Sequence, residues 1–161
     1  MDPSIAAVVE TYQVSTNLYL KALRGLDRAA LLARASDHSN PLLWIAGHLA
    51  QSRCRLASIV GVACEVPWAT LFATGSRVLE DDGYPAIHEI TSVWSDVSNQ
   101  VLRRLAELDE RDLAAPPPLR VATPDGTVRG ALALFVFHDA YHIGQMGFLR
   151  RWLGHSPLID G

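Results

Sequence analysis

RGALALFVFHDAYHIGQMGFLRRWL, the stretch from Arg129 to Leu153, decides the fold of this chain. Its apolar residues recur with the period of an α-helix along its whole length. Gly154 follows directly and Pro157 stands three residues further on, which is a normal end for a helix. The stretch therefore predicts one long helix over residues 129–153.

Three earlier stretches have the same period: Pro3–Leu26, Pro41–Val60 and Pro85–Leu108. The Asp-Pro and Asn-Pro pairs at the start of the first two are typical of an N-cap followed by a first helical proline. Four helices of about 20 residues, each about 30 Å long, predict an all-α fold, a four-helix bundle. The connections of roughly 14, 24 and 20 residues permit long crossover connections rather than a simple up-down-up-down path.

Length and composition indicate a single domain over residues 1–161. The chain is 49% hydrophobic and 19% charged, which excludes a disordered chain that cannot bury a core. A net charge of −3 without a basic stripe gives no sign of a nucleic-acid partner. No run of about 20 apolar residues predicts a membrane span. The N-terminus has no secretory signal pattern, so we expect a cytoplasmic protein.

The fourth predicted helix carries two histidines, His138 and His142, four residues apart. On a helix their β-carbons lie about 5–6 Å from each other, so both imidazoles can reach one metal ion. They belong to a stripe that is apolar at both ends, and we expect this stripe to face into the bundle. Its members are Ala131, Phe135, His138, His142, Gln145, Leu149 and Trp152.

A third histidine, His48, lies in the middle of the second predicted helix. It belongs to an apolar stripe that runs Pro41, Trp44, Ile45, His48, Leu49, Ser52 and Leu56. Three inward histidines would make a three-nitrogen metal site with open positions for water or substrate. The alternative is that they are hydrogen-bonded core residues. Metal is favoured because burying several polar rings costs free energy, and these stripes offer no inward acidic residue.

Other candidates are weaker. His88 falls in a first helical turn, and His38 and His155 lie outside the predicted helices, so we expect all three to be solvated. The two cysteines are too few for a disulfide framework or a four-thiolate metal site. Cys54 comes six residues after His48, about 240° around the helix, and should face away from it.

Asp139 raises a rival interpretation. His138-Asp139-x-x-His142 nearly matches the H-E-x-x-H motif of zinc proteases, in which the glutamate is the general base. Aspartate is shorter, and the next histidine downstream, His155, lies beyond the predicted helix, so this interpretation is disfavoured. A di-iron bundle is weaker still, because it needs inward glutamates and Glu-x-x-His pairs.

Two motifs together resemble the DinB-like family. They are Asn40-Pro41…Trp44-Ile45-x-Gly47-His48-Leu49 and His138-x-x-Tyr141-His142-x-Gly144-Gln145. The resemblance covers nearly the whole chain. It implies a four-helix bundle with a long crossover and a divalent metal held by His48, His138 and His142. The metal could be nickel, zinc, iron or manganese, because three imidazoles accept each of them.

The resemblance also implies an activity. The family includes bacillithiol and other low-molecular-weight-thiol S-transferases and mycothiol-dependent maleylpyruvate isomerases. We therefore expect a transferase or thiol-dependent isomerase, with a small thiol bound at the open metal position as a thiolate that attacks an electrophilic substrate. Tyr141 and Gln145 are candidates for contacts to a ligand histidine or to substrate. A homodimer is expected because family members often pair through a helix face.

Two other functions stay open at this point. The same metal site could activate water and make the protein a metal-dependent hydrolase. A non-catalytic bundle stabilised by metal could instead serve as a sensor or an interaction module.

Overall fold

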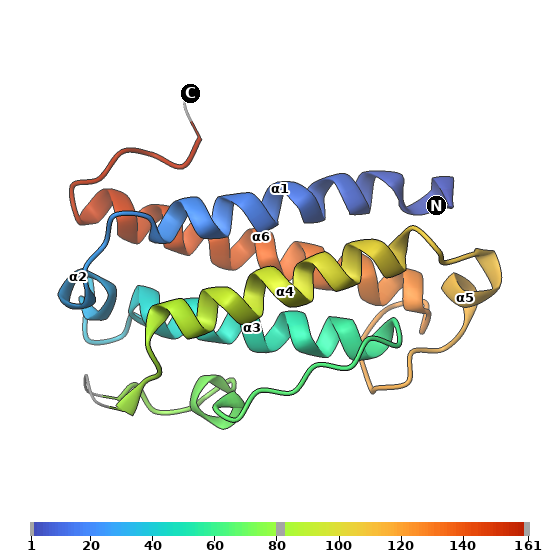
Figure 1. The fold of residues 1–161 in the computed structure, drawn as a ribbon, viewed down its shortest axis with the longest axis horizontal. Coiled ribbons are helices and arrows are strands. Elements are labelled where there is room, and N and C mark those ends of the chain that lie inside the picture. The colour runs from blue at the N-terminus through green and yellow to red at the C-terminus, as the bar shows by residue number, and fades with distance from the viewer. Residues whose placement is uncertain (1, 80–82, 160–161) are drawn as a thin grey trace.

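A computed structural model of the chain describes residues 2–79 and 83–159. Its four long helices are α1 (Ala6–Leu23), α3 (Leu42–Ile59), α4 (Ile87–Leu105) and α6 (Val128–Trp152), which lie side by side along one axis (Figure 1). They confirm the predicted all-α fold and four-helix bundle. None of the helices in the described part of the chain is both long and apolar enough to cross a membrane.

One long crossover gives the bundle its topology. After α3 the chain runs back along the whole bundle before α4 begins, so α3 and α4 point in the same direction (Figure 1). Helices α1 and α6 also share a direction, opposite to that of α3 and α4 (Figure 1). The principal packing is α1 on α6, α3 on α4 and α3 on α6. Of the long helices that follow each other in the chain, α3 and α4 pack closely, whereas α1 has its main contacts with α6, the last of the four.

Short helices occupy the connections that the sequence left without structure. They are α2 (Arg28–Leu32), α5 (Glu110–Ala114) and the 3-10 turn η2 (Ala69–Phe72), while a further 3-10 turn, η1 (Pro3–Ile5), leads into α1 within the first predicted helix. Asp27 caps α2 by accepting a hydrogen bond from the Ala30 amide at 2.8 Å. A helix of five residues is too short to show a period, which is why hydrophobic periodicity missed α2 and α5.

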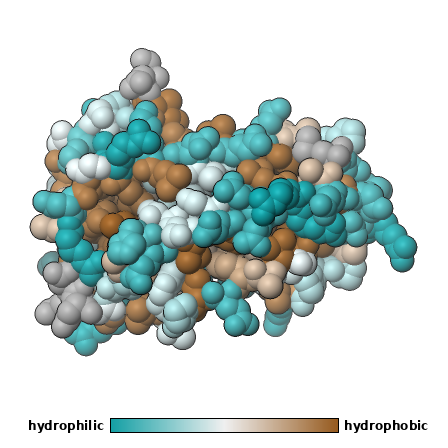
Figure 2. Space-filling view, viewed as in Figure 1, coloured by the Kyte–Doolittle hydropathy of each residue, from teal (hydrophilic) through white to brown (hydrophobic). Residues whose placement is uncertain are grey.

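The core consists of two hydrophobic clusters, and each long helix contributes residues to both. One cluster contains Tyr19, Ile90 and Met146, and the other contains Ile5, Val101 and Leu132. Along α1, α3, α4 and α6 the two sets of residues occupy opposite halves of the helix. The side of α4 that faces the viewer in Figure 2 is covered largely by hydrophilic residues.

A buried polar layer lies between the two clusters. The Arg53 side chain, from α3, is 1% exposed and pairs through Nη2 with Asp139 Oδ2 on α6 at 2.5 Å. Its Nη1 donates to Thr16 Oγ1 on α1 at 2.9 Å and to Ser98 Oγ on α4 at 2.8 Å. One guanidinium thereby connects all four long helices at the middle of the bundle.

Aromatic rings enclose the same guanidinium. Its carbon lies 3.8 Å from the ring centroid of Tyr12 and 3.8 Å from that of Trp94. Each contact is a cation–π interaction, which gains strength when water is excluded. Burial raises the pKa of Asp139 above its ordinary value, and the Arg53 charge opposes that rise. The layer thus holds a desolvated ion pair between hydrophobic surfaces.

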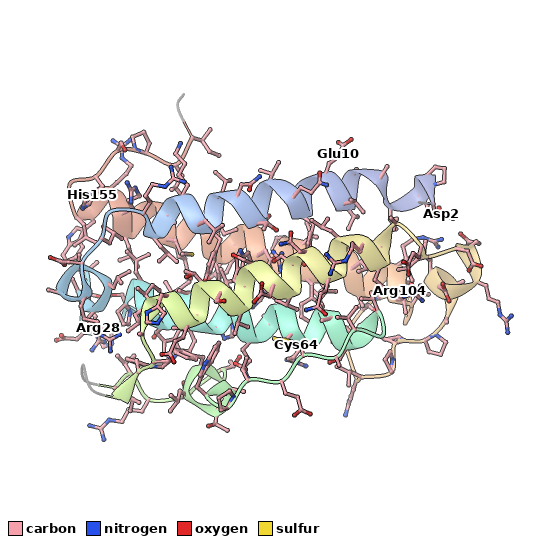
Figure 3. The ribbon with its side chains drawn as sticks, viewed as in Figure 1. Asp2, Glu10, Arg28, Cys64, Arg104 and His155 are labelled. Atoms are coloured by element: carbon pink, nitrogen blue, oxygen red, sulfur yellow. A yellow bond between two sulfur atoms is a disulfide. The ribbon has the colours of Figure 1, made fainter. Side chains whose placement is uncertain are left out.

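The two cysteines form a disulfide, Cys54–Cys64, which joins α3 to the crossover that follows it (Figure 3). Two cysteines are too few for a multi-disulfide framework or a four-thiolate metal site, but they suffice for this single bond, which was not expected from the sequence. Cys54 is buried in the second hydrophobic cluster and does not line the cavity beside the histidines described below.

We expect Asp139→Asn to lower the free energy of unfolding by about 3–5 kcal/mol, because it leaves a buried charge without its partner. Urea denaturation followed by circular dichroism measures the change. The matched control is Glu110→Gln, which removes the partner of Arg129 in a surface pair. Exposed pairs contribute about 1 kcal/mol or less. Equal destabilisation by the two variants would show that the polar layer does not hold the helices together.

Candidate metal centre

Three histidines meet where α3 faces α6. His48 comes from α3, and His138 and His142 come from successive turns of α6. Their candidate ligand nitrogens all lie within 4.8 Å of one another. His48 is buried, and the other two rings are half-buried. The structure thus brings together the three residues that the sequence singled out.

His48 is oriented by its contacts with the crossover. Its Nδ1 lies 2.8 Å from the carbonyl oxygen of Phe72, and its ring stacks on Trp44 at 4.9 Å between centroids. A carbonyl only accepts, so Nδ1 must carry the proton and Nε2 is left with a free lone pair. The Phe72 ring can approach α3 because residue 47 is glycine, where an added Cβ would lie 2.4 Å from that ring.

His142 is oriented by its own helix. Its Nδ1 donates to Gln145 Oε1 at 2.8 Å, and Gln145 Nε2 donates to the hydroxyl of Tyr141 at 3.3 Å. These bonds place Gln145 beside His142 and Tyr141 beside Gln145, while their roles toward a metal ligand or a substrate stay predictions. Tyr141 is 57% exposed, so it is no core residue. The bond to Gln145 again leaves the Nε2 lone pair of His142 free.

His138 completes the group. Its Nδ1 lies 3.3 Å from Ser52 Oγ, and its Nε2 lies 3.1 Å from Nε2 of His48. If Nδ1 of His138 donates to the serine, the two Nε2 lone pairs point at each other with no proton between them. A cation between the nitrogens removes that repulsion, whereas an apolar core would not.

The spacing of two of these nitrogens suits a metal ion. Two zinc–nitrogen bonds of about 2.0–2.1 Å hold their nitrogens about 2.8–3.4 Å apart at angles between a right angle and the tetrahedral angle. The 3.1 Å between His48 Nε2 and His138 Nε2 falls in that interval. Imidazole suits zinc, nickel, copper and iron, so the donor set fits a divalent transition metal and does not select one.

The environment keeps all three rings neutral, as ligands must be. Burial, followed by the charges of His142 and His48, lowers the pKa of His138 to about 4. Burial likewise lowers the pKa of His48 and of His142, despite hydrogen bonds that favour the protonated rings. The Arg55 guanidinium lowers the pKa of His48 and His138 further.

A cavity of about 560 Å³ opens beside the histidines. His48 and His138 form part of its wall, together with Ser52, Tyr141 and residues of the segment before α6. The site is therefore accessible to a small molecule from one side. His138 borders this space, and both His138 and His142 are half-buried at the edge of the bundle rather than buried inside it, as the stripe predicted.

The buried face of α6 differs from the predicted stripe. Trp152 is 49% exposed, whereas Asp139, Ile143 and Met146 are buried in the core. The predicted stripe left out Asp139, so it missed the one acidic residue of α6, which points into the core. Asp139 is 1% exposed and bonded to Arg53, so it cannot act as the general base of a zinc-protease motif.

The remaining candidates stay outside the site. His88 and His38 are exposed as expected, and His155 is half-buried beyond the end of α6. Sequence reasoning missed Arg53 altogether. The available signal was that Arg53 lies in the middle of a long, largely apolar helix, directly after the stripe residue Ser52.

Comparisons with known proteins agree with this architecture. The family model of the DinB superfamily matches residues 11–146. No curated protein matches the sequence. A solved structure, YfiT from Bacillus subtilis, superposes with a TM-score of 0.69 at 15% identity, covering 97% of this chain and 91% of that one. YfiT is described as "a probable metal-dependent hydrolase with an unusual four-helix bundle topology". At this identity the likeness concerns the fold, and the family match shows that the chain belongs to the DinB superfamily.

Proposed function

We propose that His48, His138 and His142 hold one divalent metal ion and that the protein is a metal-dependent enzyme. The observation that carries the proposal is the convergence of the three imidazoles, with Nδ1 of His48 and His142 occupied by acceptors. This leaves Nε2 of His48 and of His142 available to one ion, and Nε2 of His138 lies 3.1 Å from that of His48. A bound divalent ion acts as a Lewis acid that lowers the pKa of a coordinated thiol or water.

The preferred reaction is the transfer of a small thiol to an electrophile, or a thiol-dependent isomerisation. The chain's part is to keep the imidazoles neutral, fix their orientation and offer a cavity next to them. Apolar side chains on the cavity wall, among them Leu134 and Phe137, would exclude water from a substrate held there. The thiol itself is supported by family membership and is the part of the proposal that needs the most direct test.

Hydrolysis is the second candidate. It is favoured by the description of YfiT, which shares the fold, as a probable metal-dependent hydrolase. The same three imidazoles and the same cavity would serve either reaction. A sensor or interaction bundle is less favoured, because a cavity beside the histidines gives a small molecule access to them.

Two expectations from the sequence stay predictions. A homodimer would need an apolar surface, and α6 exposes a row of large apolar side chains that includes Phe137, Phe148 and Trp152. A cytoplasmic location remains our proposal too, although a disulfide such as Cys54–Cys64 is uncommon in that reducing compartment.

We expect about one divalent ion per chain in the untagged protein and a near-complete loss of it in His142→Ala. Elemental analysis after incubation with nickel, zinc and manganese measures both. His88→Ala is the matched control, since His88 is exposed on α4 outside the site. Metal-free protein in all three samples would show that the histidines are polar residues without a metal.

Metal affinity should fall as the pH is lowered, but at a lower pH than it would for ligands with the pKa of free imidazole. Protons compete for the ligand nitrogens, and free imidazole binds them near pH 6.5. Because the pKa of His138 is lowered to about 4 and those of His48 and His142 are lowered as well, little affinity should be lost above pH 6.5. The loss should begin below that pH and become steeper toward and below about pH 4, where His138 itself takes up a proton.

Competition titrations against a chelator at a series of pH values measure this curve, after correction for protonation of the chelator. A curve that stays flat even below pH 4 would contradict three imidazole ligands. A loss complete above pH 6.5 would contradict the environment described for them.

Turnover of an electrophile should require added thiol. The measurement follows 1-chloro-2,4-dinitrobenzene with and without cysteine as the thiol, and 4-nitrophenyl acetate with no thiol, on metal-loaded protein. His138→Ala should reduce the thiol-dependent rate to background. Ester hydrolysis without thiol would instead support a metal-dependent hydrolase. No turnover at all, with a large fall in melting temperature on metal removal, would favour the sensor.

A further inference from the structure

We propose that the cavity beside the three histidines binds a small organic anion, with Arg55 and Arg120 holding its carboxylate or phosphate group. The inference deepens the proposed function, on which it rests, because it names the class of substrate that the site takes. It is carried by the composition of the cavity wall rather than by the identity of the metal.

The charges on the wall are of one sign. Arg55 and Arg120 both line the cavity, and among the described residues that line it none is Asp or Glu. Neither arginine forms a salt bridge with another residue in the described part of the chain. Other cationic side chains of the protein do have such partners, as Arg53 and Arg129 show. The cavity therefore carries positive charge that the protein itself does not neutralise.

The two guanidinium groups come from separate parts of the chain. Arg55 follows His48 by seven residues, two turns along α3, and thus lies on the same face of that helix. Its charge is close enough to lower the pKa of both His48 and His138. Arg120 belongs to the segment between α5 and α6, which brings Val121 and Ala122 to the same wall. Two independent segments thus bring cations to one space.

The rest of the wall is suited to an apolar body. Leu134, Phe135 and Phe137 contribute hydrophobic surface, and Tyr141 adds an aromatic ring. Guanidinium groups recognise carboxylate and phosphate through paired hydrogen bonds of fixed geometry. A molecule with an anionic group and an apolar body therefore matches the cavity, whereas a cation or a fully polar sugar does not.

A metal in the site would strengthen this preference. Three neutral imidazoles bring no negative charge, so the ion's two positive charges would add to those of the arginines. A cleft lined by charge of one sign concentrates ligands of the opposite sign. An uncharged substrate would leave all of this charge without a counterion.

The test compares three probes of similar size: phenylacetate, phenyl phosphate and the uncharged phenylacetamide. Calorimetric titrations at pH 7.5 and low salt are run on the metal-free and the metal-loaded protein. We expect at least one anion to bind at least about 10-fold more tightly than the amide, as bonds to charged groups allow. The tighter of the two anions identifies the preferred group.

Arg55→Gln and Arg120→Gln should each lower the affinity for that anion by about 10-fold and leave the affinity for the amide unchanged. Arg103→Gln is the matched control, since Arg103 is exposed on α4 and does not line the cavity. Unchanged melting temperatures would show that the exposed arginines are not needed for folding.

Failure of the anion site and failure of the metal site give different results. If the metal-free protein binds the anion in a way that depends on the arginines, and elemental analysis finds no metal, the anion site stands and the metal centre is overturned. Equal affinities for anion and amide, no binding of any probe, or anion affinity that the arginine variants leave unchanged would each overturn the anion site.

Discussion

The buried Arg53 guanidinium is the main constraint on the bundle, because its charge requires partners from all four long helices. Removing a charge from water costs several kcal/mol unless other groups replace the lost hydration. Here the replacements come from every long helix: Asp139, Thr16 and Ser98 bond to the guanidinium, while Trp94 covers one of its faces. A shift of any helix by one turn would deprive the charge of a partner. The layer therefore fixes the axial positions of helices that hydrophobic contacts alone would allow to slide.

The candidate metal centre follows from that alignment. Neighbouring residues on a helix point about 100° apart, so a pair of them can serve two environments. On α6, Asp139 faces the core and His138 faces the cavity. On α3, Arg53 likewise faces the core, while Ser52 faces the cavity and lies beside His138. The core ion pair and the histidine contacts are thus made by adjacent residues of the same two helices.

The sequence predicted the parts that depend on local order. Helical periodicity gave the four long helices, and the spacing of His138 and His142 placed both on one side of α6. It could not show that the buried side of α6 is turned toward Asp139, because the partner that makes this favourable stands 86 residues away in α3. The convergence of Arg55 and Arg120 was hidden for the same reason. Contacts between distant segments leave no trace in a local pattern.

The arrangement of helices has a consequence for how the chain folds. The first long helix, α1, packs principally on the last, α6, and α3 packs on α4 across the crossover. Simple helical bundles fold quickly because their contacts are local in sequence. This bundle instead has to close long loops before its principal interfaces exist, so its folding should be slow for an all-helical protein of its size. During synthesis the apolar side of α1 lacks its principal partner until α6 has left the ribosome, a period in which protection by a chaperone would matter.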